Sequence, residues 1–156
     1  DAVRYYLLRE ISATDDGDFS FEKFEARYNA DLAGGIGNLL ARIVAMSNKL
    51  GVEKEKLDNK ELKKQIKLTE ENYSKEMELF HFNEVLKSIW DLIGFCDKYI
   101  DDQKPWETKD RKVISNLLFA LGKISNLLRP FLPEASEKIF QQLKTKKSEL
   151  LFPRFQ

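Results

Sequence analysis

Three residues carry side chains suited to reading unpaired nucleic-acid bases. Asn38 and Arg42 are four residues apart, so on a helix they share one face. An amide offers both a donor and an acceptor and a guanidinium offers a planar set of donors, so this pair matches the edges of bases. Trp106 follows Lys104-Pro105, and an exposed tryptophan ring stacks on a base with a gain of about 1–3 kcal/mol. The simpler alternatives are a solvated polar pair and a tryptophan that packs onto the following helix.

Other candidate chemistries fail on residue type or spacing. His81 is the one histidine, and no cysteine lies at ligand spacing from it. Cys96 falls on an apolar face, which is typical of a small core residue. The glycines at 34, 35 and 37 lack the Lys-Ser/Thr of a phosphate loop, and the acidic run 15–18 lacks the glutamate that closes a calcium loop. We therefore expect no catalytic residue, metal ligand or cofactor in this chain.

Length and composition narrow the function further. The chain has 156 residues, enough for one domain, and its 26 basic residues balance 26 acidic ones. This balance excludes a strongly basic nucleic-acid-binding surface, so any contact with nucleic acid must be local. The sequence holds no signal peptide and no apolar run of about 20 residues, so we expect a cytoplasmic protein with no membrane partner. The start at Asp1, without methionine, suggests a piece of a longer chain.

The elements that must position these residues are helices. Apolar residues recur at steps of three and four, and no segment alternates over the length of a strand, which predicts an all-α bundle of about five helices. We expect the glycines at 34, 35 and 37 either to kink the longest helix or to allow another helix to cross it closely. The lysine- and glutamate-rich segment 52–70 is expected to form a short exposed helix and a mobile connecting loop. The strongest helical patterns cover 1–11, 21–50, 82–100, 113–128 and 133–143.

Three stretches of the sequence resemble bacterial-type methionyl-tRNA synthetase: DAVRYYLLREI through NLLAR, FNEVLKSIWDLIGFCDKYIDDQKPW, and LRPFLPEASEKI. The resemblance covers roughly 1–50 and 77–144. It implies that 20–144 form the α-helical anticodon-binding domain of the class I synthetase type. It also implies that 1–19 end the module that connects this domain to an upstream catalytic domain, and that 145–156 form a C-terminal tail.

The resemblance also implies roles for individual residues. Asn38 and Arg42 match the helix pair that hydrogen-bonds to anticodon bases, and Trp106 matches the ring on which the first anticodon base, a cytosine, stacks. Pro105 shapes that loop. Asp101 matches an acidic position at the edge of the site, where an unpaired carboxylate repels wrong anticodons.

The implied partner is the anticodon loop of the methionine acceptor tRNA. The parent enzyme is then a methionine–tRNA ligase that uses ATP and Mg²⁺ at its catalytic domain, and this chain alone is expected to be inactive. Near Trp106, the best candidates to contact tRNA phosphates are the basic residues Lys104, Lys109, Arg111 and Lys112.

Two departures from the family pattern and two alternatives complete the prediction. Asp97 stands where relatives usually carry asparagine, and Gly34-Gly35 replace bulkier polar residues. One alternative is the same domain from a leucyl, isoleucyl, valyl or cysteinyl synthetase, against which the Pro-Trp pair argues. The other is a helical interaction bundle with no role in nucleic-acid binding, which predicts a buried Trp106.

Overall fold

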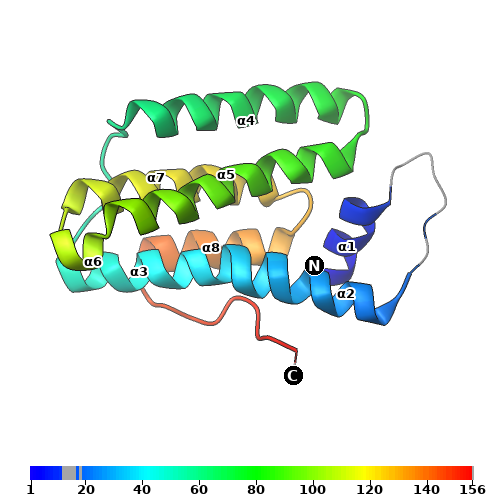
Figure 1. The fold of residues 1–156 in the computed structure, drawn as a ribbon, viewed down its shortest axis with the longest axis horizontal. Helices are drawn as coiled ribbons and strands as arrows, with labels where there is room; N and C mark the ends of the chain where they lie inside the picture. Colours follow the sequence, from blue (N-terminus) through cyan, green and yellow to red (C-terminus); the bar gives the residue numbers. More distant parts are fainter. Residues whose placement is uncertain (12–16, 18, 156) are drawn as a thin grey trace.

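The computed structural model describes residues 1–11, 17 and 19–155, and these form an all-α bundle, as predicted (Figure 1). No strand occurs among them. The acidic run 15–18 lies outside the described residues except for Gly17. The helices are α1 (Ala2–Glu10), α2 (Phe21–Arg27), the π-helix η1 (Tyr28–Gly37), α3 (Asn38–Leu50), α4 (Lys60–Glu78), α5 (Phe82–Gln103), α6 (Pro105–Thr108), α7 (Arg111–Leu128) and α8 (Pro133–Thr145).

The elements α2, η1 and α3 form one continuous rod, which matches the helix predicted over 21–50 (Figure 1). The rod ends at Gly51, whose φ of 61° provides the left-handed C-cap. Its middle is π-helical, and the buried residues there are spaced four apart: Phe24, Tyr28, Leu32 and Ile36. In an α-helix each step of four turns this row by about 40°, and the π turn, which holds more residues, opposes that rotation.

Two of the three glycines in η1 are required by this wide turn. A Cβ on Gly34 would lie 2.9 Å from the carbonyl oxygen of Asn29, and one on Gly37 would lie 2.8 Å from that of Leu32. Both distances are shorter than side chains tolerate. The predicted kink is therefore replaced by an uninterrupted rod, in which glycine removes a steric clash along the backbone (Figure 1).

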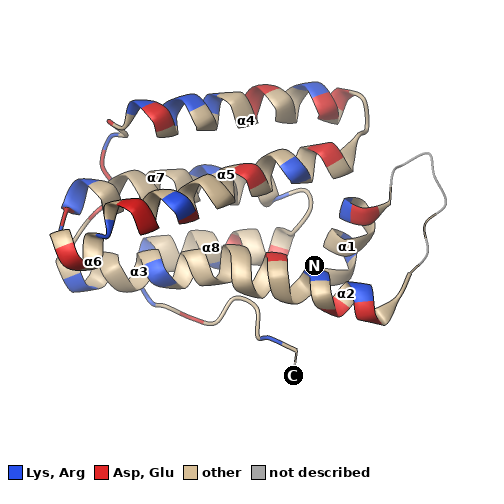
Figure 2. Cartoon of the chain, in the orientation of Figure 1, with Lys and Arg blue, Asp and Glu red and all other residues tan. Residues whose placement is uncertain are grey.

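The prediction for 52–70 was wrong in its main part. Residues 60–78 form the 19-residue helix α4, which packs along α5 (Figure 1). Asn59 caps the helix, since its side chain accepts a hydrogen bond from the backbone amide of Leu62 at 2.8 Å. The face toward the bundle is narrow, with Leu62, Ile66 and Thr69 buried, and charged residues cover much of the remaining surface (Figure 2).

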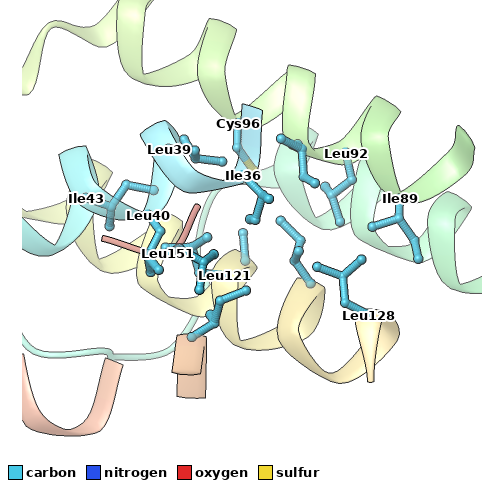
Figure 3. Close-up of a cluster of buried hydrophobic side chains, with 14 of the residues drawn as sticks. Ile36, Leu39, Leu40, Ile43, Ile89, Leu92, Cys96, Leu121, Leu128 and Leu151 are labelled. Atoms are coloured by element: carbon cyan, nitrogen blue, oxygen red, sulfur yellow. The ribbon is translucent and has the colours of Figure 1, made fainter. Parts of the chain in front are cut away.

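The core lies between the rod, α5 and α7. Figure 3 shows Ile36, Leu39, Leu92 and Cys96 pointing toward one another, with other buried side chains around them. Cys96 is fully buried, and burial raises the pKa of its thiol to about 12, so it is a packing residue. Among the described residues, none of the helices is both long and apolar enough to cross a membrane.

Helix α1 is fastened to the π-helical part of the rod. The hydroxyl of Tyr5 donates to Asp31 at 2.6 Å, and burial together with this carboxylate raises the pKa of Tyr5. The ring of Trp90 lies 4.5 Å from that of Tyr5, and its indole N–H donates to the carbonyl of Asp31 at 3.3 Å. Residues 2–10 therefore share the core of the bundle.

The C-terminal tail lies along the bundle (Figure 1). Leu151 is buried beside Leu40 in the core (Figure 3). The side chain of Asn29 accepts from the backbone amide of Phe155 at 3.0 Å and donates to its carbonyl at 3.4 Å. The tail thus packs against the same rod that carries Asn38 and Arg42.

Candidate nucleic-acid interface

Arg42 lies at the centre of a polar cluster at one end of the bundle. Its guanidinium donates to Asp97 at 3.3 Å and forms a second ion pair with Asp101. The expectation that Asp101 presents an unpaired carboxylate is therefore wrong, because Arg42 neutralises it. The central carbon of the guanidinium lies 5.7 Å from the centroid of the Trp106 ring, over the ring face. The fold thus brings together α3, α5 and α6. Of the five residues predicted for this site, Arg42 contacts two others, Asp101 and Trp106.

The end of α5 explains how Trp106 reaches Arg42. Asp97 and Asp101 are one turn apart on α5, which ends at Gln103, and Lys104 then adopts a left-handed conformation with φ of 43°. Pro105 follows as the first residue of α6, where its fixed φ suits the start of a helix, and it is buried. This reversal directs the chain back over α3. Pro105 therefore shapes the turn, and Trp106 is placed by it.

The indole of Trp106 remains accessible. It is 40% exposed, whereas Trp90 is packed on Tyr5 and hydrogen-bonded. The interaction-bundle alternative predicts a buried Trp106 and merely solvated side chains at Asn38 and Arg42. The exposure of Trp106 and the ion pairs of Arg42 contradict it, whereas the exposed side chain of Asn38 agrees with it. A partly exposed aromatic ring beside a guanidinium is suited to stacking on an unpaired base.

Asn38 lies one helical turn before Arg42, as the first residue of α3. Its side chain is exposed. It lies directly after the π-helix, so the geometry of η1 sets the direction in which Asn38 points. The predicted shared face of Asn38 and Arg42 is therefore present on a regular helix, although Asn38 stands outside the ion-pair cluster.

The cluster carries more negative than positive charge. Arg42 contributes one positive charge against the two carboxylates of Asp97 and Asp101. Burial raises the pKa of Asp97, Arg42 opposes that shift and Asp101 adds to it. The guanidinium of Arg42 is thus neutralised, and the two carboxylates leave acceptor oxygens at the cluster. The sequence marked Asp97 only as a departure from the family, and its direct contact with Arg42 was missed.

The predicted phosphate-binding group is only partly available. Arg111 donates to the carbonyl oxygens of Leu50 and Gly51, each at 2.8 Å, so it caps the C-terminal end of α3. Lys104 lies 3.9 Å from Glu107. Lys109 and Lys112 are exposed. The part of the chain that the structure describes holds no cluster of three histidine, cysteine or acidic residues arranged to bind a metal ion.

Comparison with known proteins identifies the domain. A family model described as the anticodon-binding domain of tRNA ligase matches residues 59–155. The chain belongs to this family. A second model, described as tRNA synthetases class I (M), matches residues 1–44, which include α1, α2, η1 and the first half of α3.

The similar curated proteins are methionine–tRNA ligases. The chain is 42% identical over 158 residues to that of Clostridium tetani, with 92% of this chain and 24% of the relative covered. It is 43% identical over 161 residues to that of Clostridium perfringens, with 94% and 25% covered. It is 36% identical over 193 residues to that of Bacillus subtilis, with 100% and 29% covered. The chain therefore spans about a quarter of the length of these relatives.

A solved structure shares the fold. The apo form of Mycobacterium tuberculosis methionyl-tRNA synthetase aligns with a TM-score of 0.82 and 25% identity, over 99% of this chain and 39% of that protein. The sequence relatives and this structural neighbour agree with the predicted methionyl-type anticodon-binding domain.

Proposed function

We propose that this anticodon-binding domain recognises the anticodon loop of methionine tRNA through Trp106, Arg42 and Asn38. The observation that carries the proposal is the position of Arg42 over a Trp106 ring that is 40% exposed. The names of the curated relatives supply the identity of the tRNA.

Binding requires that the anticodon bases leave their stack, which costs a few kcal/mol. Stacking of one base on the open face of Trp106 returns about 1–3 kcal/mol of this. Hydrogen bonds from Arg42 and Asn38 to base edges supply the remainder and the sequence preference. Asp101 disfavours bases that present an acceptor to its carboxylate, because such a pair leaves two acceptors facing each other.

The parent protein is proposed to be an ATP-dependent methionine–tRNA ligase of the cytoplasm. Its catalytic domain, with ATP and Mg²⁺, would precede residues 1–19, which end the connecting module. Residues 20–144 form the anticodon-binding domain and 145–156 the tail. One structural neighbour is described as a complex with methionyl-adenylate, which is an ATP-derived intermediate.

This chain alone is expected to show no methionine-dependent exchange between ATP and pyrophosphate. Robust exchange would contradict the proposal that the catalytic domain lies outside this chain.

A binding titration at low salt with two RNA hairpins tests the proposal. One hairpin carries the methionine anticodon loop, and the other differs only in its first anticodon base. A clear preference for the first hairpin supports the proposal. Equal binding of both, or no binding at high protein concentration, argues against base reading by this domain. Because the net charge is zero, we also expect a shallow dependence of affinity on salt.

A further inference from the structure

A groove of about 370 Å³ lies between α7 and α8, lined in part by residues that neither the core nor the Arg42 cluster uses. Its floor is apolar, and Phe140 within it is 52% exposed. Gly122 on α7 leaves the groove open, since a Cβ built there meets only the ammonium of Lys54, at 3.8 Å. The apolar floor is formed by Leu118, Phe119, Phe140 and Leu143.

Lysines from separate segments surround this floor. Lys146 donates to the carbonyl of Val52 at 3.1 Å and pairs with Glu53, and both side chains line the groove. Lys123 is turned to Glu70 on α4, at 2.8 Å. Lys54 and Lys144 also line the groove, and neither forms an ion pair with a residue that the structure describes. Two positive charges therefore lie beside an apolar surface without an acidic partner.

We propose that this groove binds a small amphipathic anion, with a flat apolar body on the floor and a carboxylate at Lys54 and Lys144. The volume lies at the small end of the range for ligand pockets, about 300–1,000 Å³. It therefore favours a compact molecule over a helix, whose anchors repeat along several turns. The lysine charges select an anion, and the apolar floor disfavours inorganic phosphate alone.

A titration of the 156-residue chain with 1-naphthaleneacetate, followed by amide chemical shifts, tests the site. Its neutral amide, 1-naphthaleneacetamide, is the matched probe. We expect saturable shifts centred on Gly122 and Leu143 and a Kd of about 1 mM, the affinity that about 14 non-hydrogen atoms give at ordinary ligand efficiency. The neutral amide should bind about fivefold more weakly, the fold-change that two surface ion pairs provide.

Variants separate the groove from non-specific binding. Gly122→Leu fills the groove and should abolish the shifts, while its thermal midpoint stays equal or rises because leucine favours a helix over glycine. The double variant Lys54→Gln/Lys144→Gln should bind acid and amide alike. Lys138→Gln, which removes an exposed lysine of α8 outside the groove, should bind as the parent does.

Three results would overturn the site. These are equal affinity for acid and amide in the parent chain, binding that survives Gly122→Leu, and the absence of saturable shifts up to about ten times the expected Kd. If the anticodon hairpin instead of the naphthalene acid shifts Gly122 and Leu143, the groove is an RNA contact and the proposal is wrong. None of these results bears on base reading at Trp106, which the hairpin titration measures.

Discussion

The guanidinium of Arg42 lies 5.7 Å above the ring of Trp106, and the same guanidinium is held by Asp97 and Asp101 on α5. The Trp106 ring therefore has a cation near one face, and the residue is 40% exposed to solvent. An incoming base that stacks on the open side would place the charge on the opposite side of the ring. In the proposed mode of binding, the contact between Arg42 and Trp106 is present before RNA arrives, and Arg42 would exchange a hydrogen bond to a carboxylate for one to a base edge.

Replacement of Trp106 by alanine should weaken binding of the cognate hairpin by about 1–3 kcal/mol, because one base loses its stacking partner. The fold should be retained, since the side chain is half-exposed on a short helix. Hairpin titration and thermal unfolding measure the two effects. Phe21→Ala, which removes another exposed aromatic ring at the opposite end of the rod from Arg42, is the control and should bind RNA normally. Unchanged affinity in Trp106→Ala would remove this residue from the interface.

Replacement of Arg42 by alanine should narrow the preference between the two hairpins by about 1–3 kcal/mol, the discrimination that a two-point contact with a base edge provides. Arg42→Lys keeps the charge and loses the planar pair of donors, so it should lose most of the same preference. The affinities of both variants for both hairpins, measured by titration, test this prediction. A uniform loss of affinity for the two hairpins would make Arg42 a phosphate contact.

The carboxylate of Asp97 gives the domain a pH dependence of known sign. Burial raises its pKa in the folded state, whereas the unfolded chain has the ordinary value of about 3.9. Protonated Asp97 therefore stabilises the fold at pH values below the ordinary pKa, and this contribution is lost as the pH rises through the raised pKa. Asp97→Asn should consequently increase the free energy of unfolding at pH 7, by less than about 1 kcal/mol, and change it little at pH 4.

Urea unfolding of the parent and Asp97→Asn at both pH values measures this difference. Asp91→Asn, an exposed carboxylate on the same helix, is the control and should show no such difference between the two pH values. An equal shift in stability at pH 4 and pH 7 would show that the effect of Asp97→Asn comes from packing instead of charge.

Much of the fold could be predicted from local pattern. The apolar steps of the rod, Gly51 at its end and Pro133 at the start of α8 all act within a few residues, so the sequence displays them directly. The sequence predicts a helix within 52–70 but not the length or packing of α4, because only three of its side chains are buried and one of them, Thr69, is polar. Because few apolar residues stand among many lysines and glutamates, the sequence of α4 shows only a weak helical periodicity of apolar residues.

The residues of the site could be predicted from the sequence, but the contacts between them could not. The spacing of Asn38 and Arg42 is a property of one helix. The ion pairs of Arg42 join residues 55 and 59 positions apart, and they depend on how α5 packs against α3. The π-helix was hidden as well, although the row from Phe24 to Ile36 contains three successive steps of four, which would rotate by about 120° in total in an α-helix.

The π-helix yields the sharpest test of how the rod is built. In an ordinary α-helix the replacement of glycine by alanine stabilises by about 1 kcal/mol. At Gly37 the added Cβ would lie 2.8 Å from the carbonyl oxygen of Leu32, so Gly37→Ala should instead destabilise by about 1–3 kcal/mol. Gly94 lies in the middle of α5 with no atom within 4 Å of a Cβ, so Gly94→Ala is the matched control and should stabilise. Urea unfolding measures the change in the free energy of unfolding for both variants. The two changes have opposite signs if residues 28–37 are π-helical, and both are stabilising if this segment is an ordinary α-helix.

Because Asn38 follows Gly37 directly, the destabilised variant should also bind the cognate hairpin more weakly, whereas Gly94→Ala should bind it as the parent does.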